Sequence, residues 1–282
     1  MFDSFFITDL HGHTDRYRKL FSVIRDEVPE YVFFGGDLLP HRMRMVENFN
    51  DFVYDFLFPE MRKLKNDLGN KFPAIFLILG NDDPKIEEIK FIEGSHEGLF
   101  FYMNMKKQTY GKITVFGYPY VPPTPFQLKD WEKYDVSRYV DPGCIHPTEG
   151  FRSMVPIEDI EYSTISNDLE LLAGDDEMEH AVFLFHTPPY HCHLDRAALD
   201  GVMVDHVPLD VHVGSIAVQR FIMNKQPLCT LHGHIHESTR ITGHWKEKFG
   251  RTVAINGSTD NPELSLVKFN ALDPDHAIRV LL

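Results

Sequence analysis

The chain has 282 residues, of which 43% are hydrophobic, and carries a formal net charge of −14. This length and composition exclude a disordered protein and predict one large domain or two small ones with a substantial core. The negative charge disfavours binding to a bare polyanion such as DNA unless bound cations reverse the sign locally.

The first part of the chain has the alternating pattern of an α/β fold. An apolar run at 5–8 precedes a helical period over 17–28, and a second apolar run follows at 31–34. Together they predict a β-α-β unit whose strands are largely buried. A longer amphipathic segment then leads to a third apolar run at 74–79. Its apolar positions include Met45, Phe49, Phe52, Phe56 and Leu64.

Later apolar runs are shorter, and several predict antiparallel additions to the sheets. They lie at 99–103, 113–117, 252–256, 264–269 and 277–282. Two sheets covered by helices fit this mixture. No repeat or linker divides the chain, so we predict a single domain over 1–282. Prolines and aromatic residues near 118–155 predict an ordered, irregular insertion of the kind that borders active sites.

Polar side chains follow five apolar runs, at the point where each predicted strand ends. They are Asp9 and His11 in TDLHGH, Asp37 in GGD, Asn81 in GNDD, His186 after AVFLF, and His234 and His236 in GHIH. Open α/β sheets place their ligands at the carboxyl ends of strands. Asp, Asn and His suit Mn²⁺, Fe or Zn²⁺ better than a Cys-rich structural zinc site. Because these donors exceed what one tetrahedral ion needs, we predict two metals that share a bridging carboxylate and act on a phosphoryl group.

Other residues near these motifs have an alternative explanation. His232 alternates with His234 and His236, so the three could form a half-exposed strand edge, and packing is the default for His232. The segment 256–258 could lie near the site or form a plain turn. The aromatic residues of the insertion could stack on a nucleobase, although packing within the loop is favoured. They are Tyr118, Tyr120, Phe126 and Trp131.

The motifs DLH, GGD, GND, a histidine before TPP, and GHIH, in this order, closely resemble the calcineurin-like metallophosphoesterase superfamily. The resemblance runs from Asp9 to His236. It implies two mixed β-sheets packed as a sandwich and flanked by helices, in four α-β-β-α layers, with a dinuclear metal centre. One metal would be held by Asp9, His11 and His236, and the other by Asn81, His186 and His234. Asp37 and a hydroxide would bridge them.

The implied activity is the hydrolysis of phosphate esters. The resemblance makes Asp37, Asn81, Asp82 and His186 the catalytic residues. The cofactors would be two divalent ions, with Mn²⁺ expected first and Fe, Zn²⁺ or Ni²⁺ as alternatives. We expect small phosphate esters, including nucleotides, as substrates.

One departure from the family pattern bears on the substrate. Many members read GNH followed by an acid, whereas this chain reads Asn81, Asp82, Asp83. Asp82 could act as a general acid only if its pKa were raised well above the usual value of about 3.9. Otherwise it is a solvated or helix-capping acid before Pro84.

Other histidines near the motifs could supply a proton instead, and each is also compatible with a surface or core position. They are His13, His191 and His193. Family branches that replace the GNH histidine include phosphodiesterases, so phosphodiesters are the favoured substrates. The alternatives are a phosphomonoesterase or nucleotide phosphohydrolase, and a non-catalytic metal-binding scaffold of the same fold.

Targeting and partners can also be addressed from the sequence. The N-terminus lacks a basic region and a long apolar run, and no run approaches the length of a membrane span. Three separated cysteines form neither a disulfide framework nor a Cys-x-x-Cys site. We therefore expect a cytoplasmic protein without a membrane partner. No basic stripe predicts extended nucleic-acid binding, and a homodimer is the default oligomer.

Overall fold

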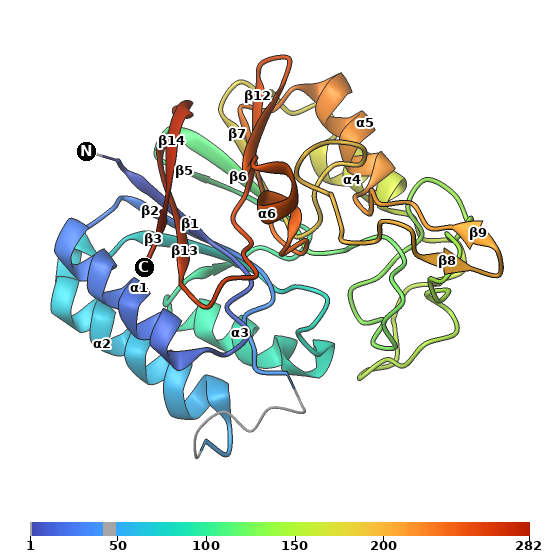
Figure 1. Ribbon diagram of the computed structural model, residues 1–282. Coiled ribbons are helices and arrows are strands. Elements are labelled where there is room, and N and C mark those ends of the chain that lie inside the picture. The colour runs from blue at the N-terminus through green and yellow to red at the C-terminus, as the bar shows by residue number, and fades with distance from the viewer. Residues whose placement is uncertain (1, 42–48) are drawn as a thin grey trace.

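Two six-stranded β-sheets face each other, and helices cover the outer face of each (Figure 1). The computed structural model describes residues 2–41 and 49–282. Its four layers confirm the predicted α-β-β-α fold. Met45, one apolar position of the predicted amphipathic segment, lies outside the described residues. The single domain over 1–282 stays a prediction.

The first sheet has the strand order β14-β13-β1-β2-β3-β4. Strands β1 to β4 are parallel, whereas β13 is antiparallel to β1 and β14 is antiparallel to β13. The strands are β1 (Ser4–Ile7), β2 (Tyr31–Gly35), β3 (Ala74–Ile78), β4 (Phe101–Tyr102), β13 (Ser265–Asn270) and β14 (Asp273–Leu281).

The second sheet has the strand order β11-β12-β10-β7-β6-β5. Its four central strands are parallel, and an antiparallel strand lies at each edge. The strands are β5 (Lys106–Tyr110), β6 (Ile113–Tyr118), β7 (Ala181–Phe185), β10 (Cys229–His232), β11 (Lys246–Phe249) and β12 (Thr252–Asn256). A separate hairpin pairs β8 (Met203–Val204) with β9 (Val207–Pro208).

The expectation of antiparallel additions was right for the last two strands, β13 and β14, and wrong for β4. It holds on one side only for β6 and β12, which are antiparallel to the edge strands β5 and β11 and parallel to their other neighbours. Strand β4 is parallel to β3, β6 to β7 and β12 to β10. The reason is the connection between the two strands of each pair. A helix lies between them in the sequence and brings the chain back to the edge of the sheet at which the first strand began. Such crossovers produce parallel pairing.

The helices form two groups (Figure 1). Beside the first sheet lie α1 (Thr14–Glu27), a π-helical turn (Val53–Leu57) that continues into α2 (Phe58–Leu68), and α3 (Glu88–His96). Beside the second sheet lie α4 (Ile165–Ala173), α5 (Ile216–Lys225) and α6 (Ser238–Thr242). Two 3₁₀ turns occupy Gly69–Lys71 and Lys85–Glu87. In these described segments no helix combines the length and apolar character needed to cross a bilayer.

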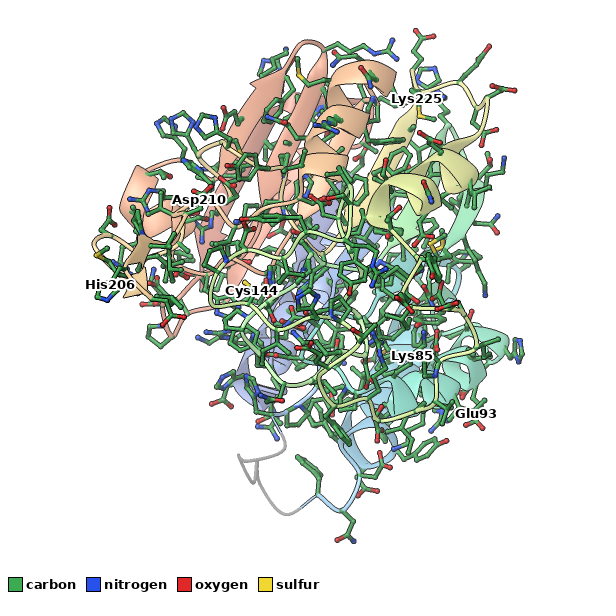
Figure 2. All side chains as sticks on the ribbon, turned by 90° about the vertical axis from the view of Figure 1, so that its right-hand side faces the viewer. Lys85, Glu93, Cys144, His206, Asp210 and Lys225 are labelled. Atoms are coloured by element: carbon green, nitrogen blue, oxygen red, sulfur yellow. The ribbon has the colours of Figure 1, made fainter. Side chains whose placement is uncertain are left out.

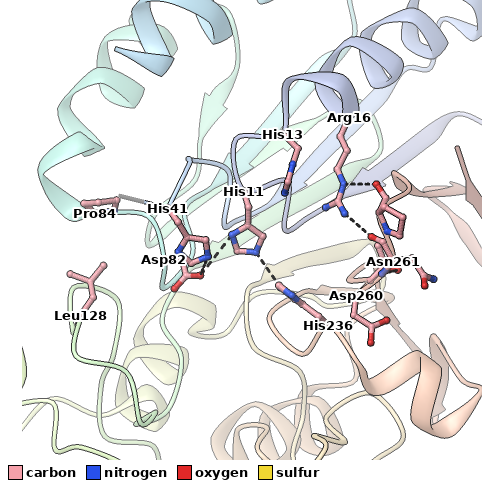
Figure 3. A pocket seen from close by; sticks show the side chains of 12 residues that line it. His11, His13, Arg16, His41, Asp82, Pro84, Leu128, His236, Asp260 and Asn261 are labelled. Carbon is pink, nitrogen blue, oxygen red and sulfur yellow. Dashed lines mark hydrogen bonds and ion pairs between the residues drawn. The ribbon is translucent and has the colours of Figure 1, made fainter. Parts of the chain in front are cut away.

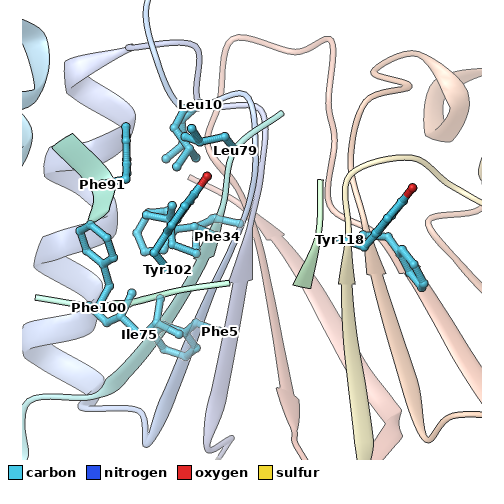
Figure 4. Close-up of a cluster of buried hydrophobic side chains, with 14 of the residues drawn as sticks. Phe5, Leu10, Phe34, Ile75, Leu79, Phe91, Phe100, Tyr102 and Tyr118 are labelled. Atoms are coloured by element: carbon cyan, nitrogen blue, oxygen red, sulfur yellow. The ribbon is translucent and has the colours of Figure 1, made fainter. Parts of the chain in front are cut away.

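The central parallel strands are buried on both faces, which explains their continuous apolar runs. Phe33 and Phe76 point into the space between the sheets, where their rings stack with centroids 5.6 Å apart. Phe5 and Phe34 belong to the opposite face and pack toward the helices (Figure 4). The core therefore fixes the two sheets against each other and sets the position of every loop at their rim.

The predicted insertion is irregular and connects β6 to α4. Its aromatic residues mainly pack the loop, since Tyr118, Tyr120 and Trp131 are buried, although Phe126 is 53% exposed. The Trp131 indole donates a hydrogen bond to the carbonyl of Asp83 at 2.7 Å, which ties the insertion to the GNDD loop. The segment crosses the side that faces the viewer in Figure 2, where Cys144 is labelled. All three cysteines of the chain are free.

Candidate metal centre

The seven predicted metal ligands come together at one rim of the two sheets. They follow the carboxyl ends of β1, β2 and β3 in the first sheet, and of β7 and β10 in the second. The donor atoms of Asp9, His11, Asp37 and His236 lie within 4.8 Å of one another. Those of Asp37, His186 and His234 do the same. The Asn81 side-chain oxygen lies 3.0 Å from Nε2 of His186 and so joins the second group.

The backbone at this rim is unusual. Asp9, His11, Asp37 and His234 have φ angles of 54°, 44°, 51° and 72°. Non-glycine residues rarely adopt this left-handed region, and each instance costs free energy that the surrounding structure must supply. Four of the seven candidate ligands therefore hold side-chain directions that a relaxed loop would not give.

In the first group, the imidazoles of His11 and His236 point at each other (Figure 3). Nε2 of His236 lies 3.2 Å from Nε2 of His11 and 3.2 Å from Oδ1 of Asp9. The Ser258 hydroxyl donates to Oδ2 of Asp9 at 2.5 Å, which holds that carboxylate in place. The segment 256–258 is therefore part of the site surroundings and more than a plain turn.

In the second group, His186 is held from both ring nitrogens. Its Nδ1 donates to the carbonyl of Gly35 at 2.8 Å, so that Nε2 faces the rim. Nε2 lies 3.2 Å from Oδ2 of Asp37. A backbone partner on one nitrogen that orients the other is the usual arrangement for a metal-binding imidazole.

In the absence of bound ions, the pKa values of the histidines and aspartates at the rim indicate an excess of negative charge there. Burial lowers the pKa of a histidine, yet Asp37 and Asp9 raise that of His186 to about 10. Burial is likewise outweighed at His236, where Asp9 raises the pKa to about 9. Burial opposes ionisation of Asp37 too, but His186 and His11 bring its pKa down to about 2. Protons on two imidazoles thus supply the positive charge that the carboxylates attract.

The donor set fits divalent cations. It consists of carboxylate and amide oxygens and imidazoles, which bind hard and borderline ions. Burial lowers the pKa of His11 to about 4 and that of His234 to about 3, so both are neutral and able to coordinate at pH 7. Nδ1 of His11 is also buried without a hydrogen-bond partner in the described part of the chain. Both groups can therefore hold an ion, and they share Asp37.

The two acids after Asn81 differ in their environments. Asp83 is fully buried and accepts backbone hydrogen bonds from Leu38, Leu39 and Gly80, so it joins the GGD and GNDD loops. The Asp82 side chain is 25% exposed, and burial together with Asp37 and Asp83 raises its pKa to about 8. A general acid needs such a shift, but bound cations would favour the ionised carboxylate.

A pocket of 960 Å³ opens beside the first group of donors. His11, His13, Arg16, His41 and Asp82 are among the residues that line it (Figure 3). Sequence reasoning missed His41, because nothing local marks a histidine four positions after Asp37 as part of the site.

The other histidines considered as proton donors lie elsewhere. His191 and His193 do not line this pocket. Nδ1 of His193 instead lies 3.0 Å from Glu247. His232 is buried and contacts the Thr187 carbonyl and the Thr230 hydroxyl, both at 2.8 Å, in agreement with the packing role expected for it.

This fold and rim define a class of α/β proteins that can hold two ions between the loops of two sheets. The family model for the calcineurin-like phosphoesterases matches residues 4–238. The chain belongs to this family, whose members hydrolyse phosphoesters with dinuclear divalent metal centres. The resemblance seen in the motifs is thereby confirmed. No curated protein is significantly similar to the chain in sequence.

Solved structures share the fold at low sequence identity. The structure of TT1561 from Thermus thermophilus has a TM-score of 0.55 and 16% identity, covering 99% of this chain and 97% of its own. A dimetal phosphatase from Danio rerio has a TM-score of 0.51 and 12% identity, covering 99% and 98%. The architecture therefore matches over nearly the full length of both proteins.

Proposed function

We propose that the protein is a dimetal-dependent phosphodiesterase. Asp9, His11 and His236 hold one divalent ion, and Asn81, His186 and His234 hold the other. The observation that carries this proposal is the division of the donors into two groups that share only Asp37. Bound divalent ions, with Mn²⁺ the first choice, supply an activated water and offset the charge on the phosphate. The Danio rerio structure of this fold is described as a dimetal phosphatase, which supports phosphoester chemistry.

The preference for diesters follows from charge at the pocket. Asp82 occupies the position of the GNH histidine found in many family members, whose imidazole would be neutral or positive. The Asp82 side chain is partly exposed to the pocket. An ionised carboxylate there repels a phosphate monoester, which carries nearly two negative charges at pH 7, more than a diester, which carries one. The pocket of 960 Å³ also leaves room for organic groups on both sides of the phosphorus.

A direct assay tests the proposal. The protein is stripped with a chelator, reloaded with Mn²⁺, and assayed with bis-p-nitrophenyl phosphate and p-nitrophenyl phosphate. We expect no turnover after stripping, recovery on reloading, and a kcat/KM for the diester about tenfold above that for the monoester, since one extra charge repulsion near the surface is of that order. A reversed preference would indicate the phosphomonoesterase alternative. Inertness toward both substrates with two ions bound would indicate the non-catalytic scaffold.

Metal uptake should also release protons. His186 and His236, with pKa values of about 10 and about 9, are protonated at pH 7 in the protein without ions and must become neutral to coordinate. His11 and His234 are already neutral and release none. Asp82, whose pKa is about 8 without ions, also ionises when cations bind, so we expect uptake of two ions to release about three protons and Mn²⁺ affinity to rise steeply from pH 6 to 8. Calorimetry in buffers of different ionisation enthalpy measures this number; a value near zero would contradict the assignment of these two ligands.

A further inference from the structure

Two histidines of the pocket, His13 and His41, have no part in the two groups of donors. His41 lies after β2, four residues beyond Asp37. Its Nε2 is 3.1 Å from Oδ2 of Asp82, and its ring stacks on that of His11 with centroids 5.0 Å apart and planes 5° from parallel. These two contacts fix the ring, while 48% of the side chain stays exposed at the pocket (Figure 3).

Among the described residues, this end of the pocket offers no arginine or lysine to an anion. Of the described residues that line the pocket, Arg16 is the only arginine or lysine. Arg16 lies on the opposite side of His11 from Asp82 (Figure 3) and donates to the backbone carbonyls of Asp9, Asn261 and Pro262. An ester bound beside the first group of donors would therefore meet the Asp82 carboxylate with His41 as the neighbouring hydrogen-bond donor.

We propose that His41 binds the substrate phosphate, supplying from the loop after β2 the imidazole that position 82 lacks. This inference rests on the proposed phosphoesterase function. Asp82 and His11 act as the support of His41: the carboxylate accepts the Nε2–H hydrogen bond and the stacked imidazole fixes the ring plane. The ring acts as an imidazolium, so that Nδ1–H is left to donate to the phosphate. The Asp at position 82 is then a positioning residue, which explains how the pocket retains a donor for the phosphate despite the Asn81-Asp82 sequence.

A competing explanation is that His41 binds a third cation. The donor atoms of His11, His41 and Asp82 lie within 4.8 Å of one another, which satisfies the distance requirement for an ion. However, His11 would then have to coordinate ions through both ring nitrogens, because its Nε2 already faces His236. An imidazole that does so must lose its last N–H proton. Substrate binding requires no such loss, so we favour it.

The test compares His41→Ala and His41→Gln in the full-length, Mn²⁺-loaded protein. A hydrogen bond to a charged group is typically worth a factor of about ten or more in affinity. We expect His41→Ala to keep the wild-type metal content, and to raise both KM for bis-p-nitrophenyl phosphate and the dissociation constant of inorganic phosphate by about tenfold. His41→Gln keeps a side-chain N–H and should recover part of the loss. His276→Ala is the matched control, since this exposed histidine pairs with Asp273 at 3.0 Å and lies outside the pocket.

Each outcome of this test supports or overturns the inference. Wild-type KM and phosphate affinity in His41→Ala would overturn it. A loss of bound metal in that variant would identify His41 as an ion ligand and would overturn it as well. If the wild-type protein with two ions is inert toward esters, the proposed function fails, and calorimetry with inorganic phosphate then decides on His41 alone. Phosphate binding that is unaffected by His41→Ala, or absent from the wild-type protein, would refute the role.

Discussion

Asp37→Ala is expected to abolish the metal binding that depends on the carboxylate shared by the two groups of donors. Turnover of bis-p-nitrophenyl phosphate should fall more than a hundredfold. Asp37 is the only carboxylate common to both groups of donors and is almost fully buried. Its removal takes one donor from each ion and leaves His186 without its charge partner at 3.2 Å. Altering an outer-shell partner of a metal ligand already costs about 10- to 100-fold, so loss of a shared ligand should cost more.

Two further variants separate the charge of Asp37 from its structural role. Asp37→Asn retains an oxygen that can accept the backbone hydrogen bond of Asp82, which is 2.8 Å long. We expect this variant to fold, to bind less metal and to remain inactive. Asp195→Asn alters another buried aspartate, which accepts backbone hydrogen bonds from His191 and Cys192, and it should keep its full metal content. Metal analysis and circular dichroism distinguish these cases. A folded Asp37→Ala protein with two ions and wild-type turnover would refute the proposed centre.

Much of this rim can be predicted from the sequence because every candidate ligand follows a buried strand. The strands before Asp9, Asp37 and Asn81 bury both faces, and each ends two or three positions ahead of its polar residue. In parallel strands such ends gather at one edge of the sheet. The local sequence therefore indicates a shared position, even though it does not give the distances.

The two edge strands of the second sheet were not predicted, for a physical reason. Strand β5, KKQTY, is exposed along its whole length, and β11, KEKF, has no buried residue. Neither has an apolar pattern, and both form because a neighbouring strand, β6 or β12, offers unpaired backbone groups. Exposed edges with charged side chains are common in sheets because they discourage pairing between molecules.

The contacts that complete the site could not be predicted either. The Ser258 hydroxyl reaches Asp9 across 249 positions of the chain, and His41 reaches Asp82 only because β2 and β3 are neighbours. Contacts of this kind leave no periodicity in the sequence. The direction of β4, β6 and β12 likewise depends on where a helical connection returns the chain, which short apolar runs do not record.

Gly36→Ala is expected to disrupt the site from the backbone and to lower the free energy of unfolding by more than about 2 kcal/mol. Gly36 has a φ of 96°, which an alanine adopts only with strain. A Cβ at this position would lie 2.7 Å from Nδ1 of His186 and 2.9 Å from the backbone of Gly80. His186 would therefore have to move, losing its hydrogen bond to Gly35 and its place beside Asp37.

The matched control for this variant is Gly243→Ala. Gly243 also has a positive φ, 77°, but a Cβ there would meet no heavy atom within 4 Å. It therefore carries the backbone strain alone, which we expect to cost about 1 kcal/mol, and it should bind two ions. Denaturant unfolding gives the two free energies, and metal analysis gives the occupancies. Equal destabilisation with full metal content in both variants would mean that the loops can move apart freely, and that the close approach of Gly36, Gly80 and His186 does not set the positions of the ligands.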